Sequence, residues 1–157
     1  MSKNRGMALV EILIGAAIIA MAIVAASSSF NMYINYALAN QENIKASYLL
    51  EEGLEVFTFF RDGGWTSNIS NLSTNTPYYL YFTGTVWTAT TTPQYVDGKF
   101  LRSIVVIDLN RDANDDISVA GTNDPNIKQI TVTVSYFQGH STTTKLTSTY
   151  ISNLYNN

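Results

Sequence analysis

A single glutamate interrupts a long apolar run near the N-terminus, and the length of that run restricts what the chain can fold into. Met7 to Ala26 is 20 residues long and apolar except for Glu11, and the 30 residues from Ile12 to Gln41 carry no formal charge. At about 1.5 Å per residue, a helix of this length matches the roughly 30 Å hydrocarbon core of a bilayer. The run therefore predicts a helix that crosses a membrane once.

A charged residue at position 11 is unfavourable in a membrane-spanning helix and therefore requires an explanation. A carboxylate near the centre of a spanning helix costs roughly 2.5–3.5 kcal/mol on insertion scales, so an acid in this position indicates a function. Lys3 and Arg5 precede the run, and the next basic residue is Lys45. Because basic residues stay on the cytoplasmic side, we expect a single-pass protein of the cytoplasmic membrane with its N-terminus inside and its C-terminus outside.

Composition limits the partners of the remaining chain, which is rich in Thr, Ser, Asn and Asp. The chain has no cysteine, so neither a disulfide framework nor a thiolate zinc site can form. Its net charge is −3, and its Lys and Arg residues are scattered singly. We expect no nucleic-acid partner, because such proteins concentrate basic residues in a patch or stripe.

Helical periodicity continues beyond the apolar run. Between Asn40 and Arg61, apolar residues recur at steps of three and four, opposite three glutamates. The apolar stripe is Ala46, Leu50, Leu54, Phe57 and Phe60, and the glutamates are Glu51, Glu52 and Glu55. Asp62-Gly63-Gly64 supplies a strong stop signal. The pattern predicts one helix over residues 7–62, with a transmembrane segment over 7–30.

The period changes to two after the helix. Segments 77–93, 99–109, 127–137 and 141–154 are rich in aromatic, β-branched and threonine residues, and 77–93 has two arms around Gly84. These patterns predict an exposed β-rich domain over residues 63–157. The predicted fold class is α+β: a long N-terminal helix whose amphipathic half packs on a four- to five-stranded antiparallel sheet.

The N-terminal motif resembles that of type IV prepilins and pseudopilins. A short basic leader ends at Gly6, Met7 follows, and Glu11 is the fifth residue after the glycine within MALVEILIG. The resemblance implies that a prepilin peptidase removes residues 1–6 by cutting between Gly6 and Met7, and then methylates the new amine of Met7. It also implies that Glu11 meets the terminal amine of a neighbouring subunit, setting the axial register as the helices bundle. The alternative is that Glu11, four residues after Met7, pairs with the amine of its own chain or complements the helix dipole.

By the same resemblance, the protein is a structural subunit and no enzyme. The partners implied are other pilin or pseudopilin subunits and an assembly platform protein, and the final location is an extracellular or periplasmic filament of type IV pilus or type II secretion type. Met7 stands where phenylalanine is commoner, Ser27 to Ser29 contain no proline, and cysteine is absent. These departures favour a minor pilin or pseudopilin over a cysteine-containing major pilin.

An alternative interpretation of the N-terminus is an ordinary secretory signal. Val24-Ala25-Ala26 before Ser27 fits a small-residue cleavage site, and the product would be a soluble β-domain acting as a calcium-dependent binding or adhesive module. A signal core usually has about 7–15 apolar residues and no acid, whereas this run has 20 residues and contains Glu11. Both features favour the filament subunit.

A candidate calcium site lies in the stretch DLNRDANDD. Oxygen-bearing side chains recur at every second residue, as in the first half of a calcium-binding loop. They belong to Asp108, Asn110, Asp112, Asn114 and Asp116. Ala113 and Val119 occupy the positions where an EF-hand needs glycine and glutamate, so an EF-hand proper is excluded. The alternative is a turn in which Asx side chains bond to the local backbone.

Two further features have ordinary structural interpretations. The sole histidine, His140, lies in a predicted turn, and no catalytic group accompanies it in the sequence pattern. Aromatic residues crowd the segment 77–87, where they are suited either to a sugar-binding platform or to cross-strand packing. Packing is the commoner use of such residues. The aromatic residues are Tyr78, Tyr79, Tyr81, Phe82 and Trp87.

Overall fold

The chain is α+β, as the sequence predicts. The computed structural model describes residues 5–139 and 141–154, so most of the basic leader and His140 lie outside the described residues. Contacts divide the chain into two compact units, Met1–Glu42 and Asn43–Asn157. The described part of the first unit contains only helix, and the second contains the end of that helix and the whole sheet.

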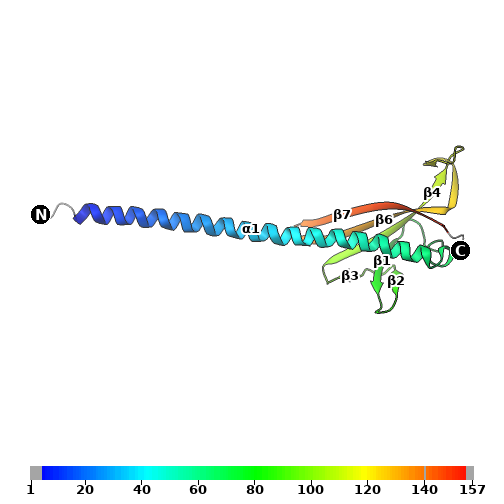
Figure 1. Cartoon of the computed structure of the whole chain (residues 1–157), viewed down its shortest axis with the longest axis horizontal. Coiled ribbons are helices and arrows are strands. Elements are labelled where there is room, and N and C mark those ends of the chain that lie inside the picture. The colour runs from blue at the N-terminus through cyan, green and yellow to red at the C-terminus, as the bar shows by residue number, and fades with distance from the viewer. Residues whose placement is uncertain (1–4, 140, 155–157) are drawn as a thin grey trace. The chain divides into compact units, whose positions relative to one another are not determined.

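The long helix α1 extends from Arg5 to Asp62 (blue to green in Figure 1), which confirms the predicted helix to within two residues at its start. It ends at the predicted glycines. Gly63 N–H donates to Phe59 O at 2.9 Å, and Gly64 has a φ of 135°, a value that side chains with a Cβ rarely adopt. A short helix α2, Trp65–Asn68, follows, and Asn68 Nδ2 donates to Phe60 O at 3.0 Å.

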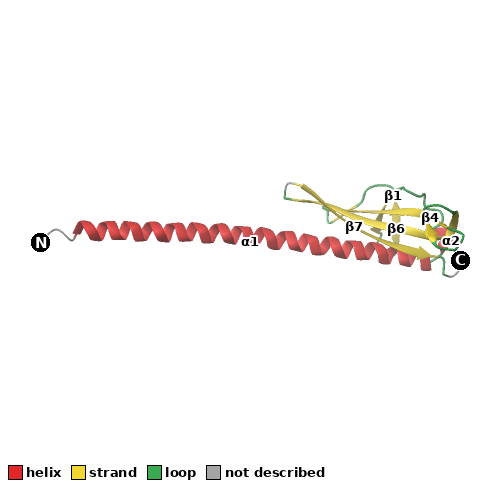
Figure 2. Ribbon diagram, turned by 90° about the horizontal axis from the view of Figure 1, so that it is seen from above, coloured by secondary structure: helices red, strands yellow, loops and turns green. Residues whose placement is uncertain are grey.

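The sheet is antiparallel throughout and its main path has the order β2-β1-β4-β6-β7. The long strands lie side by side in Figure 2. The strands are β1 (Pro77–Phe82), β2 (Trp87–Thr90), β3 (Tyr95–Val96), β4 (Phe100–Arg111), β5 (Ile117–Ser118), β6 (Thr122–Gln138) and β7 (Ser141–Ser152).

The predicted number of four to five strands is too low, since the described residues form seven. The difference is β3 and β5, which have two residues each and pair only with β4. A strand of two residues is too short to show an alternating sequence pattern, so it is recognised only by its pairing with a longer neighbour. The predicted hairpin is confirmed: Phe82 pairs with Trp87, and Gly84 in the turn has a φ of 96°.

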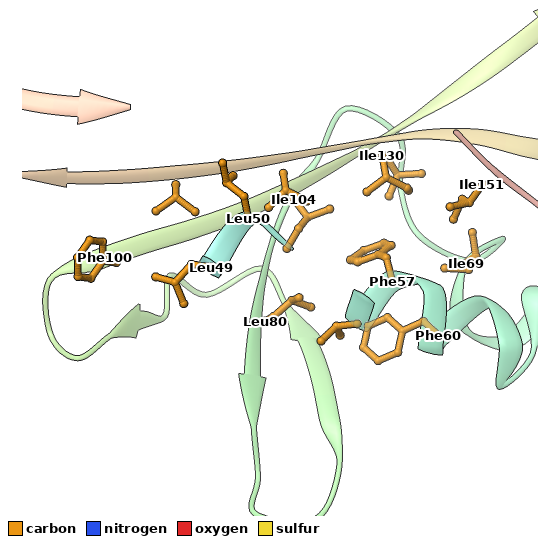
Figure 3. Packing of buried hydrophobic residues seen from close by; sticks show 14 of the residues in the cluster. Leu49, Leu50, Phe57, Phe60, Ile69, Leu80, Phe100, Ile104, Ile130 and Ile151 are labelled. Atoms are coloured by element: carbon orange, nitrogen blue, oxygen red, sulfur yellow. The ribbon is translucent and has the colours of Figure 1, made fainter. Parts of the chain in front are cut away.

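The core of the second unit lies between the last turns of α1 and one face of the sheet (Figure 3). On α1, Ala46, Leu50, Phe57 and Phe60 of the predicted stripe are buried, and Leu54 packs against their edge. The sheet contributes alternate residues from one part of β4 and of β6, including Ile104 and Ile130. The predicted packing of the amphipathic half of the helix on the sheet is therefore confirmed.

A glycine allows the helix to approach the sheet closely. A Cβ atom at Gly53 would lie 2.7 Å from Val132 Cγ1 on β6. From its sequence context Gly53 is only a weak point of the helix, with a cost of about 1 kcal/mol relative to alanine. The structure shows that this position also needs the absence of a side chain.

Candidate functional site

The first unit exposes apolar side chains in every direction around its helix. Residues Met7, Leu9, Val10 and Ile12 to Ile14 are all exposed, although successive residues of a helix point about 100° apart. The most apolar 18-residue window of α1 has a mean hydropathy of 2.6 and buries none of its surface in the protein. The N-terminal helix is thus long and apolar enough to cross a membrane.

Glu11 lies on this apolar helix, one turn after Met7. A step of four residues places two side chains on the same face of a helix, so Met7 and Glu11 are neighbours there. Gly15 is a further step of four along, and a Cβ atom added to it would meet no atom within 4 Å beyond the adjacent backbone of its own helix. This face therefore combines one carboxylate with a small residue, which allows another helix to come close.

The predicted cleavage point lies at the edge of the described residues. Met7 is exposed and helical, and the backbone of Gly6 is helical as well, whereas residues 1–4 of the leader lie outside the described residues. The exposed side chains of Met7 and Glu11 thus lie on one face of the helix.

The candidate calcium residues lie in two different settings. Asp108 is on β4, where its carboxylate pairs with Lys128 of β6. Asp112 begins the turn between β4 and β5, and its Oδ1 accepts hydrogen bonds from the N–H groups of Asn114 at 2.8 Å and Asp116 at 3.1 Å. These bonds are those of an Asx turn. Asn110 is a half-buried residue of β4 that pairs with residues of β5 and β6.

Arg111 offsets much of the negative charge around this turn. Its Nε donates to Asp124 Oδ2 at 2.7 Å, and its Nη1 donates to Asp115 O at 2.6 Å. The bond from Arg111, joined by one from the N–H of Asn126, holds the pKa of Asp124 below its usual range. Among the described residues, no three Asp, Glu, His or Cys side chains converge as in a metal site. Calcium binding by this loop stays a prediction.

An ion pair with a buried arginine joins α1 to the sheet, and the sequence patterns did not predict it. The Arg102 side chain on β4 is only 2% exposed, and its Nη1 lies 3.0 Å from Glu52 Oε2. The predicted stripe placed Glu52 on the solvent side with Glu51 and Glu55. The alternation of Phe100, Arg102 and Ile104 contains the missing signal, because it places a charge on the face that packs against the helix.

Comparisons with protein families, curated proteins and solved structures give no match for this chain. The fold and the exposed helix define an α+β protein whose N-terminal helix could span a membrane.

Proposed function

We propose that the chain is a structural subunit, a minor pilin or pseudopilin, of a type IV pilus-like or type II secretion-like filament. A prepilin peptidase cuts between Gly6 and Met7 and methylates the amine of Met7. Before assembly the helix anchors the protein in the cytoplasmic membrane, with the sheet outside. An assembly platform protein then helps to move the subunit into an extracellular or periplasmic filament.

One observation carries this proposal: an apolar helical surface that is exposed on all sides and contains the single carboxylate of Glu11. Continuous apolar surface of this size needs lipid or protein to cover it. A plain membrane anchor would be covered by lipid alone and would have no use for Glu11. In a bundle of identical helices that carboxylate can form an ion pair, because each helix supplies one terminal amine and one acid.

The charge pairing gives the filament its register. Cleavage creates an α-amino group on Met7 with a reference pKa of about 7.7–8.0, and methylation keeps its positive charge. In a dry bundle, leaving one member of an ion pair without its partner costs roughly 3–5 kcal/mol. Subunits that place Glu11 beside the amine of a neighbour are therefore favoured over every other axial offset.

The continuity of α1 supports the filament subunit over the secretory signal. A signal peptidase cut after Ala26 would fall inside a helix that runs without interruption from Arg5 to Asp62. No proline lies between these residues, and the helix contains no break at Ser27 to Ser29. A cut at Gly6 instead leaves nearly the entire helix in the mature protein.

The deciding experiment is the intact mass and N-terminal sequence of the protein isolated from its native membrane or from shed filaments. We expect a chain that begins at Met7 and carries a methyl group on its amine. A chain beginning at Ser27 would replace this proposal with a secreted β-domain. An intact Met1 in the mature protein would leave a simple membrane anchor.

A further inference from the structure

The second unit contains a pocket of about 240 Å³ between α1, the β1–β2 hairpin and the segment around β3. Figure 1 shows the hairpin projecting away from the long strands, with β3 close by. The volume is below the roughly 300–1,000 Å³ typical of sites for drug-sized ligands, so it suits a single ring. The lining includes Glu52, Phe82, Trp87, Gln94, Tyr95 and Arg102.

The ion pair between Arg102 and Glu52 forms the charged floor of this pocket, and Glu52 is its accessible member. The Nη1 of Arg102 lies 3.0 Å from Glu52 Oε2 and donates to Leu49 O at 3.4 Å. The Nε of Arg102 is buried and has no hydrogen-bond partner among the described residues. Because that Nε has almost no accessible surface, a ligand in the pocket cannot reach it, whereas the Glu52 side chain is 39% exposed and can accept a hydrogen bond from a ligand hydroxyl.

Aromatic rings form the walls, and much of their surface faces water. Trp87 covers the guanidinium of Arg102, with Cζ 5.5 Å from its ring centroid, and Phe82 lies 5.4 Å from Trp87 at an interplanar angle of 48°. Phe82 is 52% exposed and Tyr95 is 60% exposed. Cross-strand packing therefore accounts for only part of this cluster.

We propose that this pocket binds a neutral sugar residue. The C–H face of a sugar ring packs against aromatic rings, whose π faces are electron-rich. Its hydroxyl groups can donate to the carboxylate of Glu52, whose side chain is 39% exposed, while Arg102 holds that carboxylate in place from below. Gln94 adds a side-chain amide with both donors and an acceptor.

Charge distinguishes a neutral sugar from other occupants. The charge of Glu52 already balances that of Arg102, so an anionic ligand would bring a second negative charge beside Glu52. A purely apolar side chain would cover the rings but would remove water from the Glu52 carboxylate without offering it a donor. A neutral sugar ring can pack on the aromatic rings and donate a hydrogen bond from one of its hydroxyl groups to Glu52.

The test is saturation-transfer difference NMR on the full chain in dodecylphosphocholine micelles, because maltoside detergents carry sugar headgroups of their own. The probes are glucose, galactose, mannose, N-acetylglucosamine and N-acetylgalactosamine. We expect saturation transfer to at least one of them, strongest at the ring protons of one face. Tyr95→Ala should weaken its binding by about two- to tenfold, as expected for loss of one aromatic contact.

The matched control is Tyr150→Ala, which removes a tyrosine that is 55% exposed on β7, outside the residues that line the pocket. We expect this variant to bind the sugar as well as the unmodified chain does. Absence of transfer to all five sugars would overturn the proposal. Binding that Tyr95→Ala leaves unchanged, or transfer only to a Gly-Phe-Gly peptide used as a second probe, would overturn it as well.

Discussion

The two halves of α1 are both helical, but they differ in which of their side chains are exposed. From Met7 to Ala26 the helix is apolar in every direction except at Glu11, and nearly all its side chains are exposed. From Asn43 to Asp62 it has one buried face and one charged face. Helix formation thus does not require a packing partner in the same chain, whereas the distribution of apolar residues around a helix indicates what kind of partner it needs.

The sharpest test of this difference concerns Glu11. We expect Glu11→Ala to be processed and inserted in the membrane but absent from filaments, because the amine of Met7 loses a partner worth roughly 3–5 kcal/mol in a dry bundle. The measurement is the amount of the protein in sheared filaments compared with membranes. The control is Glu51→Ala, which removes an exposed acid from the second half of the helix. Normal incorporation of Glu11→Ala would show that the carboxylate has no role in assembly.

Removing a core ring should affect only the second unit. Phe57 is buried between α1 and the sheet, so Phe57→Ala should lower the free energy of unfolding of this unit by about 3–5 kcal/mol. Unfolding of the full chain in micelles can be followed through the fluorescence of the buried Trp65. Leu13→Ala, at an exposed position of the first unit, should leave the transition in place. A similar shift in both variants would contradict the division into two units.

Glycine substitutions should also destabilise the second unit only when they are made in that unit, and the change in the free energy of unfolding should be smaller. Gly53→Val places methyl groups against Val132 and should lower the free energy of unfolding of the second unit by roughly 1–3 kcal/mol. Gly15→Val, where the new Cβ meets no atom within 4 Å beyond the adjacent backbone of its own helix, should leave that unfolding transition unchanged. Chemical denaturation of the two variants in parallel measures the difference. An unchanged midpoint for Gly53→Val would mean that the helix can move away from β6.

The smallest expected effect is a dependence of the stability of the second unit on pH in the acidic range, through Asp124. The pKa of Asp124 is held below its usual range by the bond from Arg111. Its contribution to stability is therefore complete above the unfolded-state pKa near 3.8 and is lost as the pH falls through the lower folded-state value.

Asp124→Asn should flatten the dependence of the free energy of unfolding on pH in this acidic range. Denaturation at several pH values below about 5 measures the slope. Asp62→Asn is a suitable comparison, because Asp62 also accepts from an arginine, Arg61, at 2.8 Å, but its side chain is 45% exposed, against 20% for Asp124. Exposed ion pairs contribute little to stability, so this variant should change the slope less. Equal slopes for Asp124→Asn and the unmodified chain would argue against a lowered pKa of Asp124.

Much of the fold follows from sequence patterns, but several details of the sites do not. The stripe at Ala46, Leu50 and Phe57 predicts the packed face of α1, and the alternation in β6 predicts its buried set, because both periods follow from backbone geometry alone. The role of Gly53 and the pairing of Glu52 with Arg102 depend on which strand lies beneath the helix. That choice is not local, so no spacing within one segment predicts it.

By itself, the sequence determined the long helix, the position of Glu11 within its apolar part, the hairpin around Gly84 and the alternating long strands. Each of these depends on residues close together in the chain. Only the tertiary structure decided the two short strands, the bond from Arg111 to Asp124 and the pocket between Glu52, Trp87 and Arg102. These features require separate segments of the chain to meet, and their energy comes from contacts that exist only after the strands have paired and the helix has packed on the sheet.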